Sequence, residues 1–469
     1  MNKPKAKTIF CLIGIIMGLL FSSGQIENPD THLRLTQTRL FLETGDWGLP
    51  EDVGEDQHGN IAMNELGKRH MVYNPGQSIV LIPIYAFTKT LYSNDAEIYY
   101  SAAFLVSFIN FFIHALASYF LFLIAYNLSQ SEQKAYFTSL VFCLTSYSLT
   151  LAQSTYEHHY EMLFVLIAFH FAISPKTNSK MFLIGLILSV GLLFRTTTII
   201  ALPCIVLLVS YKKQILFLLA GVLPGLFFIL FYNYFRFHNP LETGYNLAWT
   251  LAHGTNFQFW SLQKFPVNMV GFLLSPVKGL LIFSPTLILT IPFFKRFYLE
   301  HRLIAISIFL YCLFNFILFS LNFAWHGSIW SFGPRYILTI VPFMYLPLIY
   351  FEKSSLYMKF IAASLLGPIL LMSVNYKREL LTQFMNGNIK NDDEYIWEIR
   401  NTPYITQFQQ LQIIVPKNFN HNLKNLYPDE PWKKEIRKGN GNDMLNYSIE
   451  KTSINFWWAR VYNNSMISQ

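Results

Sequence analysis

The sequence has 469 residues, of which 53% are hydrophobic, 17% aromatic and only 13% charged. Soluble globular domains carry about a quarter of charged residues, so this composition excludes an ordinary soluble protein and predicts that apolar surface faces lipid. The net charge of +8 does not indicate nucleic-acid binding, because Lys and Arg lie in short clusters between apolar runs. The four cysteines show no paired spacing typical of a zinc site or a disulfide framework.

The N-terminus combines positive charge with an apolar run. Lys3, Lys5 and Lys7 precede the apolar stretch 9–23. A cleaved secretory signal starts in the same way, and this alternative stays open. No clear Ala-x-Ala site is present and many further apolar runs follow, which favours a retained first membrane helix.

Apolar runs long enough to cross about 30 Å of bilayer core predict about eleven spans. They begin near residues 8, 100, 135, 161, 181, 197, 214, 279, 303, 336 and 358. The runs 181–194 and 197–210 are short for a full crossing, which suits tilted, kinked or buried segments. The expected fold class is an all-α polytopic membrane protein.

The distribution of basic residues predicts the orientation of these spans, because cytoplasmic loops collect Lys and Arg. With a cytoplasmic N-terminus, the alternate loops carry the basic residues at 134, 176–180, 212–213, 295–302 and 353–359. This agreement requires that the apolar run 79–87, broken by Pro83, stays on the outer side as a juxtamembrane or re-entrant segment. A transmembrane domain over 1–374 and an extracytoplasmic C-terminal tail over 375–469 follow.

The first outer segment, 25–99, is long, acidic and punctuated by Gly and Pro. Within it, 33–42 is expected to form a short amphipathic helix along the membrane interface. Most carboxylates of this segment are expected to be solvated. Further outer loops are expected at 233–276 and 322–335.

The expected spans contain almost no ionisable residues. His114 and His170 are the mid-span candidates, and a hydrogen-bonded packing role is favoured for both. Coupled transporters usually place a titratable group in mid-membrane. Polar residues gather instead at the outer ends of the spans, so we expect an active site at the outer membrane face beneath loops, rather than a conduction pathway.

Asp30 follows the first span in the segment 27–34, ENPDTHLR. A partly desolvated carboxylate beside a cation such as Arg34 could take a proton from an acceptor hydroxyl. The alternative is an ordinary helix N-cap, because Asp before a helix is a standard start signal.

A second polar cluster, YEHHYE at 156–161, closes the outer end of a predicted span. Glu157, His158 and Glu161 could bind a divalent cation or orient a substrate. The spacing matches no specific zinc motif, so substrate orientation is favoured over a metal. Polar capping of a helix boundary is the alternative.

Two arginines stand on the outer side. Arg195 lies between two apolar runs, against the cytoplasmic bias of basic residues, which predicts a partner. Arg335 follows a loop rich in Gly and aromatic residues. Guanidinium groups suit phosphate oxygens, and a lipid-phosphate headgroup is the anion expected at this depth. Snorkelling to ordinary phospholipid is the alternative.

Taken in order, these segments resemble the GT-C superfamily of membrane glycosyltransferases, which use polyprenyl-phosphate-linked sugars and include the protein O-mannosyltransferases and lipid A aminoarabinose transferases. The resemblance covers most of the membrane part, each motif is degenerate, and their order carries the weight. The segments are Asp30 after the first span, Tyr73-Asn74-Pro75-Gly76, the cluster 157–161, Arg195-Thr196-Thr197, 233–245, Ser275-Pro276-Val277-Lys278-Gly279 and 331–336.

The resemblance implies a GT-C-like bundle and an inverting sugar transfer at the outer face. Asp30 would be the catalytic base, and Arg195 or Arg335 would stabilise the departing polyprenyl phosphate. The family's second acidic residue would be Glu157 or Glu161, a choice that stays open. The remaining substrate-binding candidates are Arg34, Tyr73, His158 and Lys278. Thr196, where relatives often have proline, and Ser328, where they often have glycine, are departures that weaken Arg195 and the Trp325 loop more than Asp30.

The resemblance also implies partners and a location. These are a polyprenyl-phosphate-linked sugar donor, a lipid, glycan or protein acceptor, membrane lipids, and a bacterial inner membrane with the C-terminus outside. No nucleotide site is required, no metal ligand is assigned, and a divalent cation is left open. Two other classes remain as alternatives: a flippase, polymerase or ligase of lipid-linked glycans, and a non-catalytic scaffold.

The C-terminal tail carries four tryptophans, Trp397, Trp432, Trp457 and Trp458. They are expected either to help bind an acceptor or to anchor the tail at the membrane interface.

Overall fold

The structure is a computed structural model that describes residues 3–50, 60–174, 177–253, 260–327, 331–352, 354–374, 395–408, 411 and 455–459. Within these ranges the chain is helical apart from one two-stranded sheet. Ser328 and Trp432 lie outside the described ranges, as do four carboxylates of the first outer segment, Glu51, Asp52, Glu55 and Asp56, and two basic residues of the expected cytoplasmic loops, Lys176 and Lys353.

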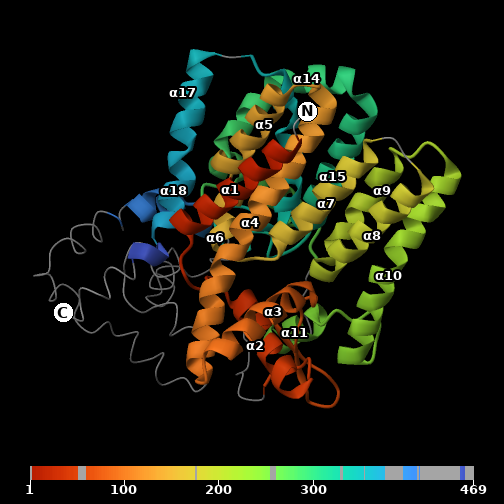
Figure 1. Cartoon of the computed structure of the whole chain (residues 1–469), viewed down its shortest axis with the longest axis vertical. Coiled ribbons are helices and arrows are strands. Elements are labelled where there is room, and N and C mark those ends of the chain that lie inside the picture. Colours follow the sequence, from red (N-terminus) through yellow and green to blue (C-terminus); the bar gives the residue numbers. More distant parts are fainter. Residues whose placement is uncertain are drawn as a thin grey trace, which may run out of the picture.

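The first half of the chain supplies most of the long helices of the bundle (Figure 1). Neighbouring contacts run α1 to α4, α4 to α5 and α7, and α7 to α8, which packs along α10. Gly185 and Gly221 let α8 and α10 approach closely, because a Cβ on Gly221 would collide with the carbonyl of Phe182. These helices are α1 (Lys3–Phe21), α4 (Asp95–Ser129), α5 (Glu132–Thr145), α6 (Tyr147–Gln153), α7 (His158–Ala172), α8 (Asn178–Phe194) and α10 (Lys212–Phe237).

The remaining helical segments are mostly shorter and more often interrupted. Proline stands in the first turn of several segments, where its missing N–H is harmless but a preceding helix cannot continue through it. The segments are η1 (Thr196–Ile200), α9 (Ala201–Val206), α12 (Phe265–Leu274), α13 (Leu280–Phe283), η2 (Pro285–Thr290), α14 (Ile291–Glu300), α15 (Arg302–Ser320), η4 (Arg335–Ile340), α16 (Val341–Met344), η5 (Leu346–Tyr350), α17 (Ser355–Ser364), α18 (Leu366–Ser373) and η6 (Ile399–Asn401).

Each of the eleven predicted apolar runs falls on a helix or on consecutive helical segments. Among the described residues, four helices are long and apolar enough to cross a membrane: α4, α10, α15 and the continuous stretch Ser355–Ser373. A fifth follows if α5 and α6, bent by 52° at Ser146, form one span. The prediction of an all-α polytopic membrane protein is confirmed, and the number eleven stays a prediction.

The expected outer segment folds against one end of the bundle, opposite the N-terminus in Figure 1. It contains α2 (Pro29–Thr44), a hairpin of β1 (Ile61–Met63) and β2 (Arg69–Met71) in which Ile61 pairs with Met71, and α3 (Gly76–Leu91). The short α11 (Tyr245–His253) lies beside them. The last five residues of 25–99 already belong to α4, which starts at Asp95.

The interfacial amphipathic helix expected at 33–42 is wrong in character. A helix is present, but it is longer, and every residue from Asp30 to Thr38 is buried, polar and apolar alike. The polar side chains of residues 30–38 therefore face protein, whereas the helix from Arg39 to its end at Thr44 is half-buried or exposed. The helix α3, which contains Pro83, packs against α2 and is not among the helices long enough to cross; its side of the membrane stays a prediction.

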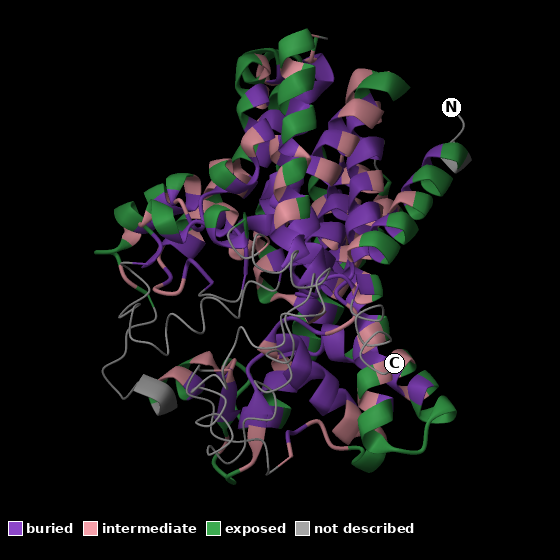
Figure 2. Cartoon of the chain, turned by 90° about the vertical axis from the view of Figure 1, so that its left-hand side faces the viewer, coloured by how far each residue is buried: buried purple, intermediate pink, exposed green. Residues whose placement is uncertain are grey.

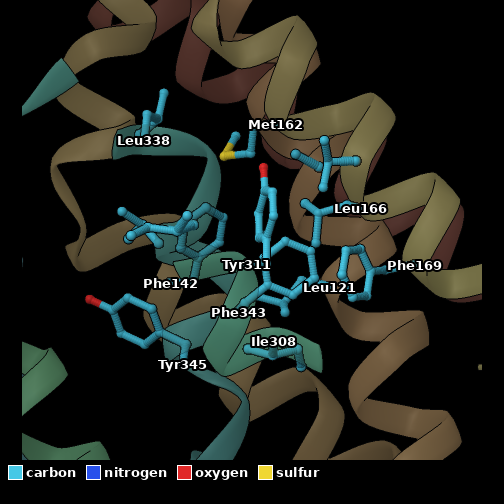
Figure 3. Close-up of a cluster of buried hydrophobic side chains, with 14 of the residues drawn as sticks. Leu121, Phe142, Met162, Leu166, Phe169, Ile308, Tyr311, Leu338, Phe343 and Tyr345 are labelled. Atoms are coloured by element: carbon cyan, nitrogen blue, oxygen red, sulfur yellow. The ribbon is translucent and has the colours of Figure 1, made fainter. Parts of the chain in front are cut away.

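One aromatic core joins the two halves of the chain (Figure 3). Phe169 of α7 packs against Phe343 of α16 with ring centroids 4.8 Å apart, and Tyr311 of α15 lies 5.7 Å from Phe343. Figure 2 shows that buried residues run through the centre of the bundle, with exposed residues towards its ends. His114 is also buried here and bonds the carbonyl of Cys143, which confirms its packing role. This core fixes the ends of the helices at which the candidate residues lie.

Candidate active site

The turn between α6 and α7 is the centre of the candidate site. Thr155 has a φ of 58°, in the left-handed backbone region. A non-glycine residue in that region costs on the order of 1–3 kcal/mol, so contacts around it must hold the turn. Its carbonyl accepts hydrogen bonds from Oγ1 of Thr31 at 3.0 Å and Nε2 of Gln77 at 2.7 Å.

The carbonyls on either side are held in the same way. The side-chain amide of Asn28, which precedes α2, donates to the carbonyl of Ser154, and that of Asn110 on α4 donates to Tyr156 at 2.8 Å. Together with the amide of Gln77 on α3, they tie the turn to three separate helices. The next residue, Glu157, is thereby fixed at the start of α7 and is buried.

Glu157 is shared by two arginines. Its Oε2 lies 3.1 Å from a guanidinium nitrogen of Arg34, and its Oε1 lies 2.9 Å from Nη1 of Arg195. Arg195 also places Nε 3.0 Å from Oε2 of Glu161, whose other oxygen accepts from Thr197 at 2.6 Å. The partner predicted for Arg195 is therefore present twice. Both carboxylates are neutralised by arginine, so the choice between them stays open.

Asp30 occupies the first turn of α2 rather than its cap. Asn28 is the N-cap, because its side chain accepts from the backbone N–H of Thr31 at 2.8 Å, and Pro29 is the first helical residue. The N-cap alternative for Asp30 is therefore wrong. The helix start stabilises its negative charge. The carboxylate is buried, and its nearest ion-pair partner among the described residues, Arg335, is 3.9 Å away.

Arg34, which pairs with Glu157, also packs against the ring of Tyr73. The guanidinium of Arg34 lies 4.2 Å from the centre of the Tyr73 ring, and the Tyr73 hydroxyl donates to Asn60 at 2.7 Å. Burial, together with the nearby carboxylate of Asp30, raises the pKa of the Tyr73 phenol well above its ordinary value. Tyr73 therefore remains a neutral hydrogen-bonding group facing the site.

Arg335 is buried among aromatic rings. Its guanidinium lies 4.5 Å from the centre of the Tyr156 ring and 5.0 Å from that of Tyr336, and it donates to the Tyr336 hydroxyl at 3.1 Å. His158 packs beside the same two rings, with centroid distances of 5.7 Å, and its Nδ1 is 3.9 Å from Glu157. The sequence candidates Arg335 and His158 thus join the cluster.

Lys278 contacts the loop before Arg335. It is buried, and its Nζ donates to the carbonyl of Ser331 at 2.6 Å, in the loop that leads to Arg335. This contact gives it a role in shaping that loop. The neighbouring Trp325 is also structural, since its buried indole packs on Gly271 and Phe272.

Several contributors were not chosen from the sequence. Tyr156, Tyr245 and Tyr336 surround the charged groups, and burial raises the pKa of Tyr245, which Arg195 opposes. All three lie inside segments that the sequence analysis had already quoted, and the aromatic residues of those segments could have been named as site residues. The roles of Asn28, Gln77 and Asn110 could not have been predicted in this way, because they depend on contacts between distant helices.

Metal binding was left open by the sequence. Over the described ranges, no group of three or more His, Cys, Asp or Glu side chains is placed to hold a metal ion. Glu157 and Glu161 instead face arginines. These residues do not form a cation site, and no metal ligand is assigned.

The chain is similar to solved structures, whereas no protein-family model and no curated protein matches its sequence. Among solved structures, the chain is similar to ArnT from Cupriavidus metallidurans bound to undecaprenyl phosphate, with 11% identity over 94% of this chain and 74% of ArnT and a TM-score of 0.52. It is also similar to the oligosaccharyltransferase AglB from Archaeoglobus fulgidus in complex with an inhibitory peptide and a dolichol-phosphate. For AglB the identity is 10%, the coverage 86% of this chain and 60% of AglB, and the TM-score 0.51.

The fold is therefore that of polytopic membrane proteins built around a helical bundle. More particularly, it is the GT-C fold that ArnT and AglB share, as the order of motifs in the sequence predicted.

Proposed function

We propose that this chain is an integral membrane glycosyltransferase that moves a sugar from a polyprenyl-phosphate-linked donor to an acceptor on the extracytoplasmic face, with inversion. The observation that carries the proposal is the contrast among the three buried carboxylates that the sequence analysis named as site residues, Asp30, Glu157 and Glu161. Glu157 and Glu161 lie within 3.1 Å of guanidinium nitrogens, whereas Asp30 lies 3.9 Å from its nearest one. Asp30 is the carboxylate that is available to accept a proton.

The chemistry then needs one displacement. Asp30 takes the proton of an acceptor hydroxyl as its oxygen bonds to the anomeric carbon of the sugar. The bond between that carbon and the phosphate oxygen breaks, and the phosphate leaves on its polyprenyl chain with an added negative charge. Guanidinium groups held in a buried setting stabilise that charge without reorganisation.

Arg335 is the better candidate for the departing phosphate. Arg195 is committed to two carboxylates, while Arg335 has its single ion-pair contact in the described chain with Asp30, at 3.9 Å. A phosphate that binds Arg335 would also weaken the hold of this arginine on Asp30, so donor binding would prepare the base. Tyr73, Arg34, His158 and either Glu157 or Glu161 would orient the sugar and the acceptor. Lys278 would hold the loop of Arg335.

The solved relatives support a lipid-phosphate substrate. ArnT is described with undecaprenyl phosphate and AglB with dolichol-phosphate. By that analogy the donor of this chain is a hexosyl or pentosyl polyprenyl phosphate, and the acceptor is a lipid, a glycan or a protein. The basic loops support a cytoplasmic N-terminus and an extracytoplasmic tail. A bacterial inner membrane is favoured by the family resemblance alone.

The test is a transfer assay on purified full-length protein in detergent. A radiolabelled polyprenyl-phosphate sugar is supplied with extracted envelope acceptors, and release of polyprenyl phosphate is followed. We expect release with the wild type and a loss of 10²-fold to 10⁴-fold with Asp30→Asn, the range that a positioned base contributes. The matched control is Asp46→Asn, which alters a partly exposed ion pair with Lys68.

Two results would overturn the proposal. Full activity in a folded Asp30→Asn protein would exclude Asp30 as the catalytic base. A donor that stays intact under every acceptor condition would favour a flippase, a polymerase with another donor, or a scaffold. Protein reconstituted in vesicles that moves the donor across the bilayer without cleaving it would indicate the flippase.

A further inference from the structure

The C-terminal end of α1 is capped by the distant segment 455–459. The last four carbonyls of a helix have no partner within it and need other donors. Here the indole Nε1 of Trp457 donates to the carbonyl of Leu19 at 2.8 Å, and that of Trp458 donates to Leu20 at 2.9 Å. The backbone N–H of Trp457 donates to Ser22 at 2.9 Å. The indole N–H groups of these two tryptophans thus bond α1, and their expected role in acceptor binding or interfacial anchoring stays a prediction.

Gln153, the last residue of α6, satisfies the remaining carbonyl. Its Nε2 lies 2.8 Å from the carbonyl oxygen of Phe21 and 3.1 Å from those of Met372 and Asn455. The side chain of Asn455 donates back to Oε1 of Gln153 at 3.2 Å. The backbone N–H of Asn455 donates to the carbonyl of Ser373 at 2.7 Å, so the same segment also holds the end of α18.

Close packing supports these hydrogen bonds. Trp457 lies edge-on to Phe104 of α4 at 6.0 Å, and Phe456 packs on Phe21 at the same centroid distance. Gly24, with a φ of 73°, lies directly beneath Trp457, and a Cβ there would come within 2.8 Å of the Trp457 Cβ. Only glycine suits that position, because both its backbone conformation and its space exclude a side chain.

The two chain segments held by this cap lead directly to the candidate carboxylates. Ser22 precedes Asp30 by eight residues, and Gln153 precedes Glu157 by four. Asn28 and Ser154, which lie within these short stretches, also bond each other. The cap therefore sits where the path to Asp30 and the path to Glu157 meet.

We propose that residues 455–459, with Gln153 as their contact, are a positioning element of the active site, which sets Asp30 relative to Glu157. This proposal rests on the proposed function for its kinetic consequence. The contacts described above join the segment to α1, α6 and α18, so its effect on the reaction would pass through α1 and the turn at Thr155.

The first measurement does not depend on activity. Hydrogen exchange is followed in full-length protein in detergent, in peptides covering residues 19–34 and 153–161. The double change Trp457→Phe with Trp458→Phe keeps both aromatic rings and removes both indole donors. We expect exchange to become about tenfold faster in both peptides. Trp260→Phe, which changes a half-exposed tryptophan elsewhere, should leave exchange as in the wild type.

The second measurement separates positioning from donor binding. In the transfer assay, the double variant should lower the rate at saturating donor about tenfold and change the donor KM by less than about twofold, because Arg335 is untouched. Gln153→Met keeps the length of the side chain, removes its donor, and should give the same split. Gln133→Met, on the exposed surface of α5, is the control.

Each outcome decides the matter. Unchanged exchange in either peptide would overturn the cap, and faster exchange with an unchanged saturated rate would overturn the positioning role. If the double variant does not fold, Gln153→Met decides by the same two measurements. If the wild type transfers no sugar, the proposed function fails, and exchange at 153–161 alone decides whether the cap holds the turn at Thr155.

Discussion

The two carboxylate oxygens of Glu157 face different arginines, and Oε1 lies only 2.9 Å from Nη1 of Arg195. Arg34 lies 3.1 Å from the other oxygen, so one carboxylate links α2, α7 and the residue after α8. All three side chains are largely buried. Removing one member of such a buried network leaves charges without compensation, which is costlier than removing an exposed pair.

Glu157→Gln should therefore destabilise the protein by about 3 kcal/mol, at the lower end for a broken buried pair because Glu161 still pairs with Arg195. The measurement is the thermal unfolding midpoint in detergent. Glu300→Gln, which alters the exposed pair with Arg296, should shift the midpoint little. Adding Arg34→Gln to Glu157→Gln should cost less than the sum of the two single changes. Strict additivity would contradict the pairing.

The sequence predicted the elements of this network but not its connections. Arg195 stood against the charge bias, which correctly implied a partner, and Asp30 does follow the first apolar helix. The helix at 33–42 was misjudged because amphipathic reasoning assumes one solvated face, whereas residues 30–38 of α2 are all buried, polar and apolar alike. The hydrogen bonds that the side-chain amides of Asn110 and Gln77 donate to the turn at Thr155 could not be predicted from the sequence, because they join residues far apart in it.

Arg335→Gln should weaken donor binding. A charge-assisted hydrogen bond contributes about 1.5–3 kcal/mol, which corresponds to an increase of roughly 10-fold to 100-fold in the donor KM. Arg335→Lys should recover part of this loss, since a lysine keeps the charge but not the planar geometry. The control is Arg400→Gln, on an exposed side chain. An unchanged donor KM in Arg335→Gln would assign the phosphate to another cation.

His70 gives the hairpin a pH dependence of stability. Burial, assisted by the positive charges of Arg236 and Lys68, lowers the pKa of His70 from 6.5 to about 4. The unfolded chain therefore binds a proton between pH 6.5 and 4 that the folded chain does not bind. Stability falls as pH drops through this window, by up to about 1.4 kcal/mol per pH unit, and the loss is absent above pH 6.5.

The measurement for His70 is the unfolding midpoint between pH 7.5 and 4.5. His70→Gln cannot take up the proton, so its midpoint should fall less steeply over that range than that of the wild type. His238→Asn, at an exposed helix end, should keep the wild-type slope. Equal slopes for the wild type and His70→Gln would rule out this histidine as the source.

Gly271 on α12 connects the core to the position of Arg335. A Cβ on Gly271 would collide with the ring of Trp325, which is 1% exposed and has little room to move. Gly271→Ala should therefore destabilise the protein by about 1–3 kcal/mol, the usual cost of overpacking. The strain should also reach the site, because Trp325 leads to Gly327, where a Cβ would be 2.9 Å from Nε of Arg335.

We accordingly expect Gly271→Ala to lower the unfolding midpoint and to raise the donor KM. The matched control is Gly18→Ala on α1, where the added Cβ would meet Phe108 at an ordinary 3.4 Å. That change also favours the helix, since alanine is the better helix former by about 1 kcal/mol. A lowered midpoint with an unchanged donor KM would show that the Trp325 loop and Arg335 move independently, and the loop would then belong to the core alone.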